Sequence, residues 1–321
     1  MPLHGRTVVR GVQNDYSELK QIGVGVFGRC FSACRVYDNE LVQLKEYNVT
    51  SMSIEDRRQL IEGIEILQCM YYRHIVQFYA SFGDSEADVH YMETELCANG
   101  SLRELICYYR NLNNSGTASI QGKVPTIGTF RTGRSVYIDE AVIWNIATQA
   151  IAGLAFLHNQ TEDNEPCAVI HRYISPESFC ISGDGVLKLD NFEVAAIAKA
   201  SKSPFNEIGR SVKGVVGVPA YRAPEIKEGE YYGPASDIWS LGCVLLELCS
   251  LKVPPVYVNE SSEFEVYIPD QYSSELRSFI RSILKIDPEQ RPTSVLLKAN
   301  KNLSRYQHAA VPIPVPARDS A

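Results

Sequence analysis

The sequence lacks any close pairing of cysteines: its 9 cysteines are scattered singly, with no C-x-x-C motif. An odd number of scattered thiols is unlike a disulfide framework and favours a reducing compartment. The sequence also lacks an excess of positive charge, since its formal net charge is −7. We therefore do not expect nucleic acid or an anionic membrane surface as a partner.

Long apolar runs are missing as well. The first residues, MPLHGRTVVRGVQNDYSE, are polar, so no secretory signal is expected there. The most apolar stretch, IWSLGCVLLELCSL from Ile238, contains Glu247 and is too short to span a bilayer, which suits a buried core helix. With 45% apolar and 21% charged residues, the composition is that of an ordinary globular protein. We expect a cytoplasmic protein without membrane contact.

What is present falls into a small β-rich part followed by a larger helical part, an α+β arrangement. Short alternating segments broken by glycines predict strands over residues 16–50. A helix follows, where Ser53 and Asp56 resemble a capping box. After Gly100 the pattern becomes helical, and DEAVIWNIATQAIAGLAFLH predicts a helix with an apolar stripe behind an acidic start.

These patterns divide the chain into five segments. The segment rich in Gly, Ser, Asn and Thr is typical of a surface insertion, and the Pro-rich end is typical of a disordered tail. The predicted boundaries are an N-terminal extension (1–15), a β-rich lobe (16–98), a helical lobe (99–300), an insertion within it (110–136) and a disordered proline-containing tail (301–321).

Gly23, Gly25 and Gly28 have the spacing G-x-G-x-x-G, which alone is a weak signal for phosphate binding. Glycine lets backbone N–H groups approach phosphate oxygens because no Cβ intervenes. A dinucleotide fold needs a helix at the last glycine, whereas the next residues here predict two strands joined by a turn. Lys45 lies on the second strand; alone it would be an ordinary solvated lysine, but after a glycine-rich hairpin it matches the protein-kinase arrangement.

Over residues 16–300 the chain resembles the eukaryotic protein kinases. MSIEDRRQLIEGIEIL, DEAVIW and SDIWSLGCVLLELCSLKVPP are most similar to the NIMA-related serine/threonine kinases. The resemblance implies a two-lobed protein-kinase fold, with a small β-rich N-lobe and a larger, mainly helical C-lobe. It also implies that Glu225 of APE pairs with Arg291 of DPEQRPT. Arg172 and Asp237 are further structural residues that the resemblance implies.

The positions that carry kinase chemistry are replaced. In the motif H-R-D-L-x-x-x-N the Asp accepts the hydroxyl proton and the Asn holds metal. Losing the base costs ~10²–10⁴ in rate, and losing the metal ligands removes the cations that neutralise developing charge. We expect no intact catalytic residue and no metal site. The resemblance places Tyr173 at the catalytic Asp, Ser175 at the phosphate-steadying Lys, Ser178 at the metal-binding Asn and Asn191 at the Asp of D-F-G.

The acid expected to pair with Lys45 from the helix falls at Gly63. Glu62 is adjacent, but one residue turns it by about 100° around the helix. Asp190 or Glu193 could rescue metal binding. Because neighbouring side chains on a strand point to opposite faces, Asp190 would need a register slip or a bulge to do so.

The resemblance implies that adenine would meet a hinge with Thr94 as gatekeeper, beside Glu95 and Cys97. We expect weak, metal-independent ATP binding, or none. Two functions remain open. One is a pseudokinase that holds protein partners, among them active kinases or cytoskeletal components, with a cytoskeletal location implied by the resemblance. The other is an active, non-standard Ser/Thr kinase.

Overall fold

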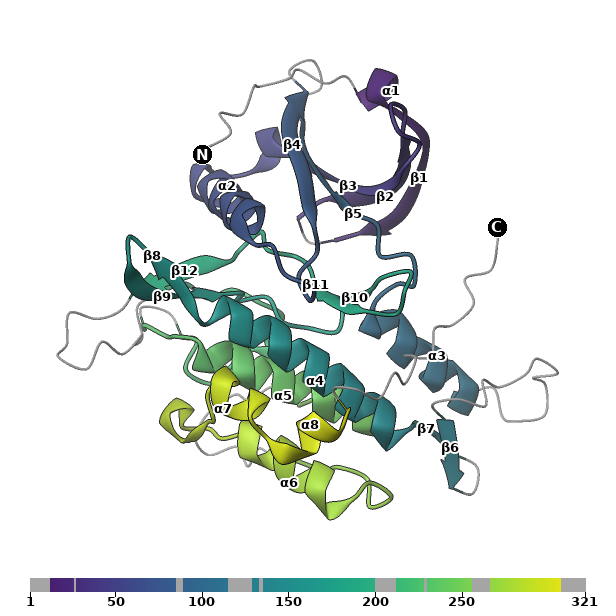
Figure 1. Ribbon diagram of the computed structural model, residues 1–321, viewed down its shortest axis with the longest axis vertical. Coiled ribbons are helices and arrows are strands. Elements are labelled where there is room, and N and C mark those ends of the chain that lie inside the picture. The colour runs from purple at the N-terminus through teal and green to yellow at the C-terminus, as the bar shows by residue number, and fades with distance from the viewer. Residues whose placement is uncertain are drawn as a thin grey trace.

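The computed structural model describes residues 12–25, 27–84, 89–114, 129–132, 135–199, 212–227, 230–255 and 266–306. A five-stranded sheet forms the upper part of the molecule, and a group of helices forms the lower part (Figure 1). This is the two-lobed α+β arrangement expected from the sequence.

The sheet of the upper lobe has the strand order β1-β2-β3-β5-β4, and each neighbouring pair is antiparallel. Its strands over the first part of the chain confirm the predicted strand-rich segment. The short helix α1 (Val12–Asp15) precedes them, and the turn η1 (Val49–Ser51) follows β3. The strands are β1 (Tyr16–Val24), β2 (Arg29–Arg35), β3 (Leu41–Asn48), β4 (Phe78–Asp84) and β5 (Val89–Glu95).

Helix α2 (Ile54–Cys69) lies beside this sheet (Figure 1). Ser53 is the N-cap: its hydroxyl accepts from the Asp56 N–H at 3.1 Å and donates to the Asp56 carboxylate at 2.7 Å, which is the Ser53 half of the expected capping box. These bonds satisfy a free donor at the helix start. Leu60 and Leu67 of α2 are buried against the core.

The lower lobe is built around α4 (Glu140–Leu157), which is capped by Asp139 and buried along most of its length. Among the described residues, α4 is long and apolar enough to cross a membrane by composition alone, and here it is the core helix. The other helices are α3 (Leu102–Asn114), α5 (Ala235–Ser250), α6 (Ser274–Ile283), α7 (Ser294–Lys298) and α8 (Lys301–Tyr306).

Short strands and turns complete the lower lobe. The hairpin of β10 (Phe179–Ile181) and β11 (Leu187–Leu189) lies at the junction of the two lobes (Figure 1). The remaining elements are β6 (Thr129–Thr132), which pairs with β7 (Ser135–Ile138); the sheet of β8 (Gln160–Glu162), β9 (Glu165–Ile170) and β12 (Ala196–Lys199); and the turns η2 (Pro219–Tyr221) and η3 (Pro288–Gln290).

Two predicted boundaries differ from the structure. The segment 110–136 begins inside α3, which continues to Asn114, and residues 115–128 lie outside the described residues. The tail 301–321 begins with helix α8, because Leu303 is buried and the Tyr306 ring stacks on Trp144. The rest of that tail, like residues 1–11 of the N-terminal extension, lies outside the described residues.

Candidate functional site

A cavity of about 280 Å³ lies between the two lobes. The turn between β1 and β2, strand β3, the loop after β9 and the segment after β11 all contribute to it. Several candidate residues from the sequence meet here, namely Gly25, Gly28, Lys45, Tyr173, Ser175 and Asn191.

Of the three glycines, Gly28 is the one that the fold requires. A Cβ on Gly28 would lie 1.9 Å from the Glu46 carbonyl oxygen, so β2 and β3 could not approach as they do. Gly25 donates its N–H to the Gly28 carbonyl oxygen at 2.7 Å, which closes the turn. Gly23 has ordinary space for a side chain and pairs with Cys30. The glycine pattern therefore serves the hairpin itself.

Lys45 is buried and fully engaged by its own chain. Its Nζ lies 2.8 Å from Asp190 Oδ1, 2.8 Å from Asn191 Oδ1 and 3.1 Å from Glu193 Oε1. An ammonium group has three protons, so all of its donors are used. Burial acts to lower the pKa of Lys45, but the charges of Asp190 and Glu193 outweigh burial and raise it.

Glu193 supplies the acid that α2 does not. A Cβ on Gly63 would lie 2.2 Å from the Phe192 carbonyl oxygen, so glycine allows α2 to approach the Phe192–Glu193 segment. Glu62 points away, as expected, and lies 3.0 Å from Arg58. No local pattern indicated that Glu193 would pair with Lys45, because the two residues are distant in the chain.

Asp190 and Asn191 both reach Lys45, although neighbouring side chains on a regular strand would point to opposite faces. Strand β11 ends at Leu189, and Asn191 has φ of 68°. A left-handed residue after a strand breaks the alternation on which the expectation relied. Burial acts to raise the pKa of Asp190, but the charge and hydrogen bond of Lys45 outweigh it and lower the pKa.

Gln43 of β3 connects the upper-lobe sheet to Asp190. It is 8% exposed, pairs with Thr94 across β3 and β5, and donates from Nε2 to Asp190 Oδ2 at 3.1 Å. In the described part of the chain, the cavity lining includes none of the predicted hinge contacts Thr94, Glu95 and Cys97.

Those hinge residues have structural surroundings instead. Thr94 and Cys97 are buried, and Glu95 lies 2.7 Å from Lys188. Glu95 also accepts from the Gln77 N–H at 2.7 Å. Glu95 of the hinge is thus bound both to Lys188 of β11 and to the Gln77 backbone just before β4.

Tyr173, at the catalytic Asp position, packs against the glycine-rich turn. Its ring centre lies 5.2 Å from that of Phe27, in an edge-to-face arrangement. Burial raises the pKa of Tyr173 above its ordinary value, so the phenol stays protonated at neutral pH. A protonated phenol does not act as a carboxylate base.

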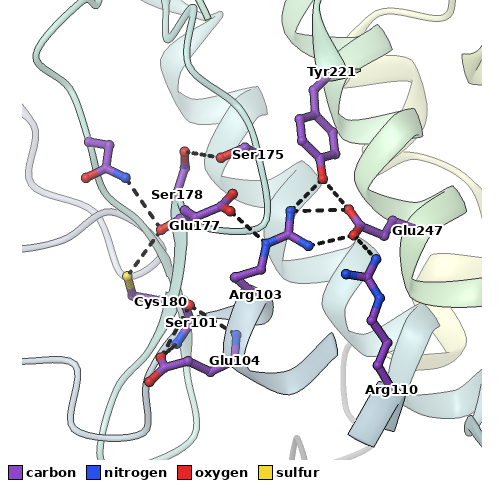
Figure 2. A network of polar contacts seen from close by, with 11 residues as sticks. Ser101, Arg103, Glu104, Arg110, Ser175, Glu177, Ser178, Cys180, Tyr221 and Glu247 are labelled. Atoms are coloured by element: carbon purple, nitrogen blue, oxygen red, sulfur yellow. Dashed lines mark hydrogen bonds and ion pairs between the residues drawn. The ribbon is translucent and has the colours of Figure 1, made fainter. Parts of the chain in front are cut away.

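Ser175 and Ser178 are fully buried and face each other, with their hydroxyl oxygens 3.3 Å apart (Figure 2). The Ser178 hydroxyl donates to the Tyr173 carbonyl oxygen. Both hydroxyls therefore hold the loop after β9 in shape.

Glu225 and Arg291 pair as the resemblance implied, and the other scaffold residues have contacts of their own. Arg291 donates from both terminal nitrogens to the Glu225 carboxylate, at 2.6 and 2.8 Å. Asp237 accepts the N–H groups of His171 and Arg172, at 2.8 and 2.9 Å. The Arg172 guanidinium donates to Tyr232 at 2.8 Å. These contacts fix the loop after β9 and the segment after Tyr221 to the helices below.

A second network of charged side chains, centred on the buried Glu247, was missed from the sequence. Figure 2 shows Arg103 of α3 between Glu177 and Glu247. Its Nε donates to Glu177 Oε1 at 2.7 Å, and its Nη1 donates to Glu247 Oε1 at 2.6 Å. Arg110 lies 2.5 Å from the same Glu247 carboxylate, and the Tyr221 hydroxyl also donates to it. An acid inside an apolar run, such as Glu247, is a signal that a buried cationic partner exists.

The residues do not fit Mg²⁺-ATP, the cofactor that the resemblance implies. Every donor of Lys45 is used within the chain, and Gln43 binds the other oxygen of Asp190. Asn191 and Ser178 offer a metal ion only neutral oxygens. Across the described residues, no group of three or more His, Cys, Asp or Glu side chains is placed to hold a metal ion.

Comparison with known proteins shows what the chain is similar to. The protein kinase domain family matches residues 16–303. The human serine/threonine-protein kinase Nek2 is 29% identical over 287 residues, which cover 87% of this chain and 57% of that protein. The G2-specific protein kinase nimA of Emericella nidulans is 27% identical over 312 residues, covering 88% of this chain and 40% of that protein. The chain thus spans about half the length of these two relatives.

Proposed function

We propose that this chain, which belongs to the protein kinase family, is a catalytically impaired NIMA-related kinase-like protein that acts as a scaffold or allosteric partner. The observation that carries the proposal is the engagement of Lys45 by Asp190, Asn191 and Glu193. A lysine whose three protons are already bound must break buried contacts before it can hold a phosphate.

The uncharged side chains at the catalytic positions support the same proposal. Phosphoryl transfer depends on positioning and on cations that neutralise the transferred group. Tyr173 replaces the base, and Ser178 and Asn191 replace the metal ligands. Any residual ATP binding is then weak and independent of metal.

The buried scaffold pairs support a role in which the folded surface binds partners and catalyses no reaction. Glu225–Arg291 and the Asp237 contacts hold the lower lobe in a defined arrangement. We propose protein partners for this surface, among them active kinases or cytoskeletal components, and a cytoplasmic or cytoskeletal location.

A phosphotransfer assay tests the proposal. The purified chain is incubated with radiolabelled ATP, casein and either Mg²⁺ or Mn²⁺, beside the kinase domain of human Nek2 as a reference. We expect labelling at least ~10⁴-fold below the reference, because base and metal ligands are lost together.

The Lys45→Ala variant is the matched control for a contaminating kinase. Labelling equal in the wild type and in Lys45→Ala agrees with the proposal. Robust metal-dependent labelling that disappears in Lys45→Ala contradicts it.

The second candidate is an active, non-standard Ser/Thr kinase, and the positions of Asp190 and Glu193 favour it. Both carboxylates lie beside Asn191 at Lys45, where they could supply the missing negative charge for a metal ion. If this function is correct, Asp190→Asn abolishes metal-dependent labelling while the chain remains folded.

A further inference from the structure

An aromatic contact joins the two lobes at the cavity. Phe27 lies in the turn between β1 and β2 of the upper lobe, and Tyr173 lies in the loop after β9 of the lower lobe. Both side chains line the cavity and are partly exposed. Their ring centres are 5.2 Å apart and their planes lie at 65°, an edge-to-face arrangement that is attractive. The contact therefore spans the gap between the lobes where the cavity meets solvent.

The Tyr173 side of this contact is fixed to the lower lobe. The Tyr173 N–H donates to His171 Nδ1 at 3.3 Å, and the Tyr173 carbonyl oxygen accepts from the Ser178 hydroxyl. Asp237 in turn accepts the N–H groups of His171 and Arg172 at 2.8 and 2.9 Å. The Tyr173 ring thus projects from a backbone that a buried hydrogen-bond network holds in place.

The Phe27 side is built on glycine. The Gly25 N–H donates to the Gly28 carbonyl oxygen at 2.7 Å and closes the turn, while Gly28 packs against the Glu46 carbonyl oxygen at its base. The Phe27 ring packs against the larger core cluster and not against the separate cluster of the upper-lobe sheet, so it faces the lower lobe. Because glycine leaves the backbone many conformations, the turn is the part that moves when the ring contact breaks.

Cys30 lies in the cavity that these two rings border. It pairs with Lys45 across β2 and β3, so the two side chains share one face of the sheet, and both line the cavity. The Cys30 thiol is partly buried, and burial raises its pKa. A thiol of this kind reacts slowly unless a reagent reaches it. The rate at which Cys30 is modified therefore measures access to the cavity.

We propose that the Phe27–Tyr173 contact is a gate that closes the cavity, and that the turn between β1 and β2 swings away from Tyr173 to open it. An edge-to-face pair favours the closed state by roughly 2- to 12-fold. An aspartate at position 173 would offer Phe27 no ring, so the gate follows from the residue that replaces the base. Entry to the cavity is a property separate from phosphotransfer, so the gate stands whether or not the chain transfers phosphate.

Modification of Cys30 by N-ethylmaleimide, an uncharged thiol reagent, tests the gate. The reaction of the full chain is quenched at intervals, and tandem mass spectrometry of the digest gives the rate at Cys30 apart from Cys34. We expect Phe27→Ala and Tyr173→Ala each to raise the Cys30 rate by roughly 2- to 12-fold. Cys107, an exposed thiol on α3, should react at one rate in every variant. An unchanged Cys30 rate in both variants overturns the inference.

Two further variants separate the ring contact from a simple loss of bulk. Tyr173→Phe keeps the ring and should leave Cys30 at the wild-type rate, whereas a rate as fast as that of Tyr173→Ala overturns the inference. In the double variant of Phe27→Ala with Tyr173→Ala the two effects should not multiply, because each substitution already breaks the same contact. A double-variant increase equal to the product of the single increases overturns the gate. Tyr71→Ala, which removes a ring that is 83% exposed, is the matched control, and a similar increase there also contradicts the gate.

Circular dichroism checks that each variant keeps its fold. If Phe27→Ala does not fold, Phe27→Leu takes its place, with a rise of about twofold or more expected and an unchanged Cys30 rate as the contradicting result. The phosphotransfer assay separates the two proposals. Metal-dependent phosphotransfer together with ring-dependent labelling overturns the proposed function alone. Labelling that does not depend on either ring, without phosphotransfer, overturns the gate alone.

Discussion

Two groups of buried charge in this chain are built differently. In the scaffold of the lower lobe, the Glu225 carboxylate meets the fully buried Arg291 side chain, and Glu247 meets both Arg103 and Arg110. In the cleft, one lysine is shared by two carboxylates. The scaffold pairs join separate elements of the fold, whereas the cleft pairs occupy the donors that a bound phosphate would need.

The comparison shows that the buried ion pairs of the scaffold hold the fold together, whereas the charged groups of the cleft bind one another. Removing one member of a balanced buried pair leaves an uncompensated charge, which is costly. Removing the surplus member of an unbalanced group leaves a balanced pair. The two regions should therefore respond differently to the same kind of substitution.

The largest effect is expected for Glu225→Gln in the scaffold. The substitution leaves the buried Arg291 guanidinium without its carboxylate, so the free energy of unfolding should fall by ~3–5 kcal/mol. Urea unfolding followed by circular dichroism measures it. Glu62→Gln, from an exposed pair, should change the same quantity by under ~0.5 kcal/mol. If Glu225→Gln lowers the free energy of unfolding by no more than Glu62→Gln does, the scaffold pair does not contribute as proposed.

A smaller loss is expected where α2 meets the cleft. Gly63→Ala places a methyl group 2.2 Å from the Phe192 carbonyl oxygen, so α2 or the following segment must shift. We expect a loss of ~1–3 kcal/mol from overpacking, although alanine favours a helix. Gly83→Ala is the control, because no atom lies within 4 Å of its Cβ position. If the free energy of unfolding of Gly63→Ala is unchanged, α2 can move away from the Phe192 carbonyl oxygen without cost, and the close packing at Gly63 is not required.

Acidification should act where scaffold and cleft meet, at His171. Burial lowers the pKa of His171, so below pH ~6.5 the unfolded chain binds a proton that the folded chain does not. Stability is then lost as the pH falls, by up to ~1.4 kcal/mol per pH unit from this group. Urea unfolding between pH 7 and 5 measures the slope. If the free energy of unfolding of His171→Gln falls with pH as steeply as that of the wild type, groups other than His171 cause the loss of stability.

The smallest effect is expected for Glu193→Gln. The remaining Lys45 and Asp190 form a balanced pair, so the free energy of unfolding should change by less than ~1 kcal/mol. The matched comparison is Glu225→Gln under the same conditions. Equal losses in the two variants would mean that the cleft holds no surplus charge.

The scaffold could be predicted from the sequence because its residues stand in short motifs. Glu225, Asp237 and Arg291 each lie in a recognisable local pattern, and the capping box at Ser53 needs only neighbouring residues. The replaced position at Tyr173 was equally visible.

The charges of the cleft could not be predicted in the same way. The partner of Lys45 depends on how closely α2 approaches Glu193, which Gly63 decides through a contact between distant segments. The orientation of Asp190 depends on one left-handed residue after β11. Neither feature has a period or a motif, so sequence patterns carried no information about them.

The contacts of Lys45 also bear on how the two lobes move against each other. Lys45 belongs to β3 of the upper lobe, whereas Asp190, Asn191 and Glu193 belong to the segment after β11. Swinging the lobes apart would pull an ammonium group from its carboxylates, so these ion pairs hold the two lobes together at the cleft. Because Gly63 of α2 packs against the same segment, a displacement of α2 would also disturb the contacts of Lys45.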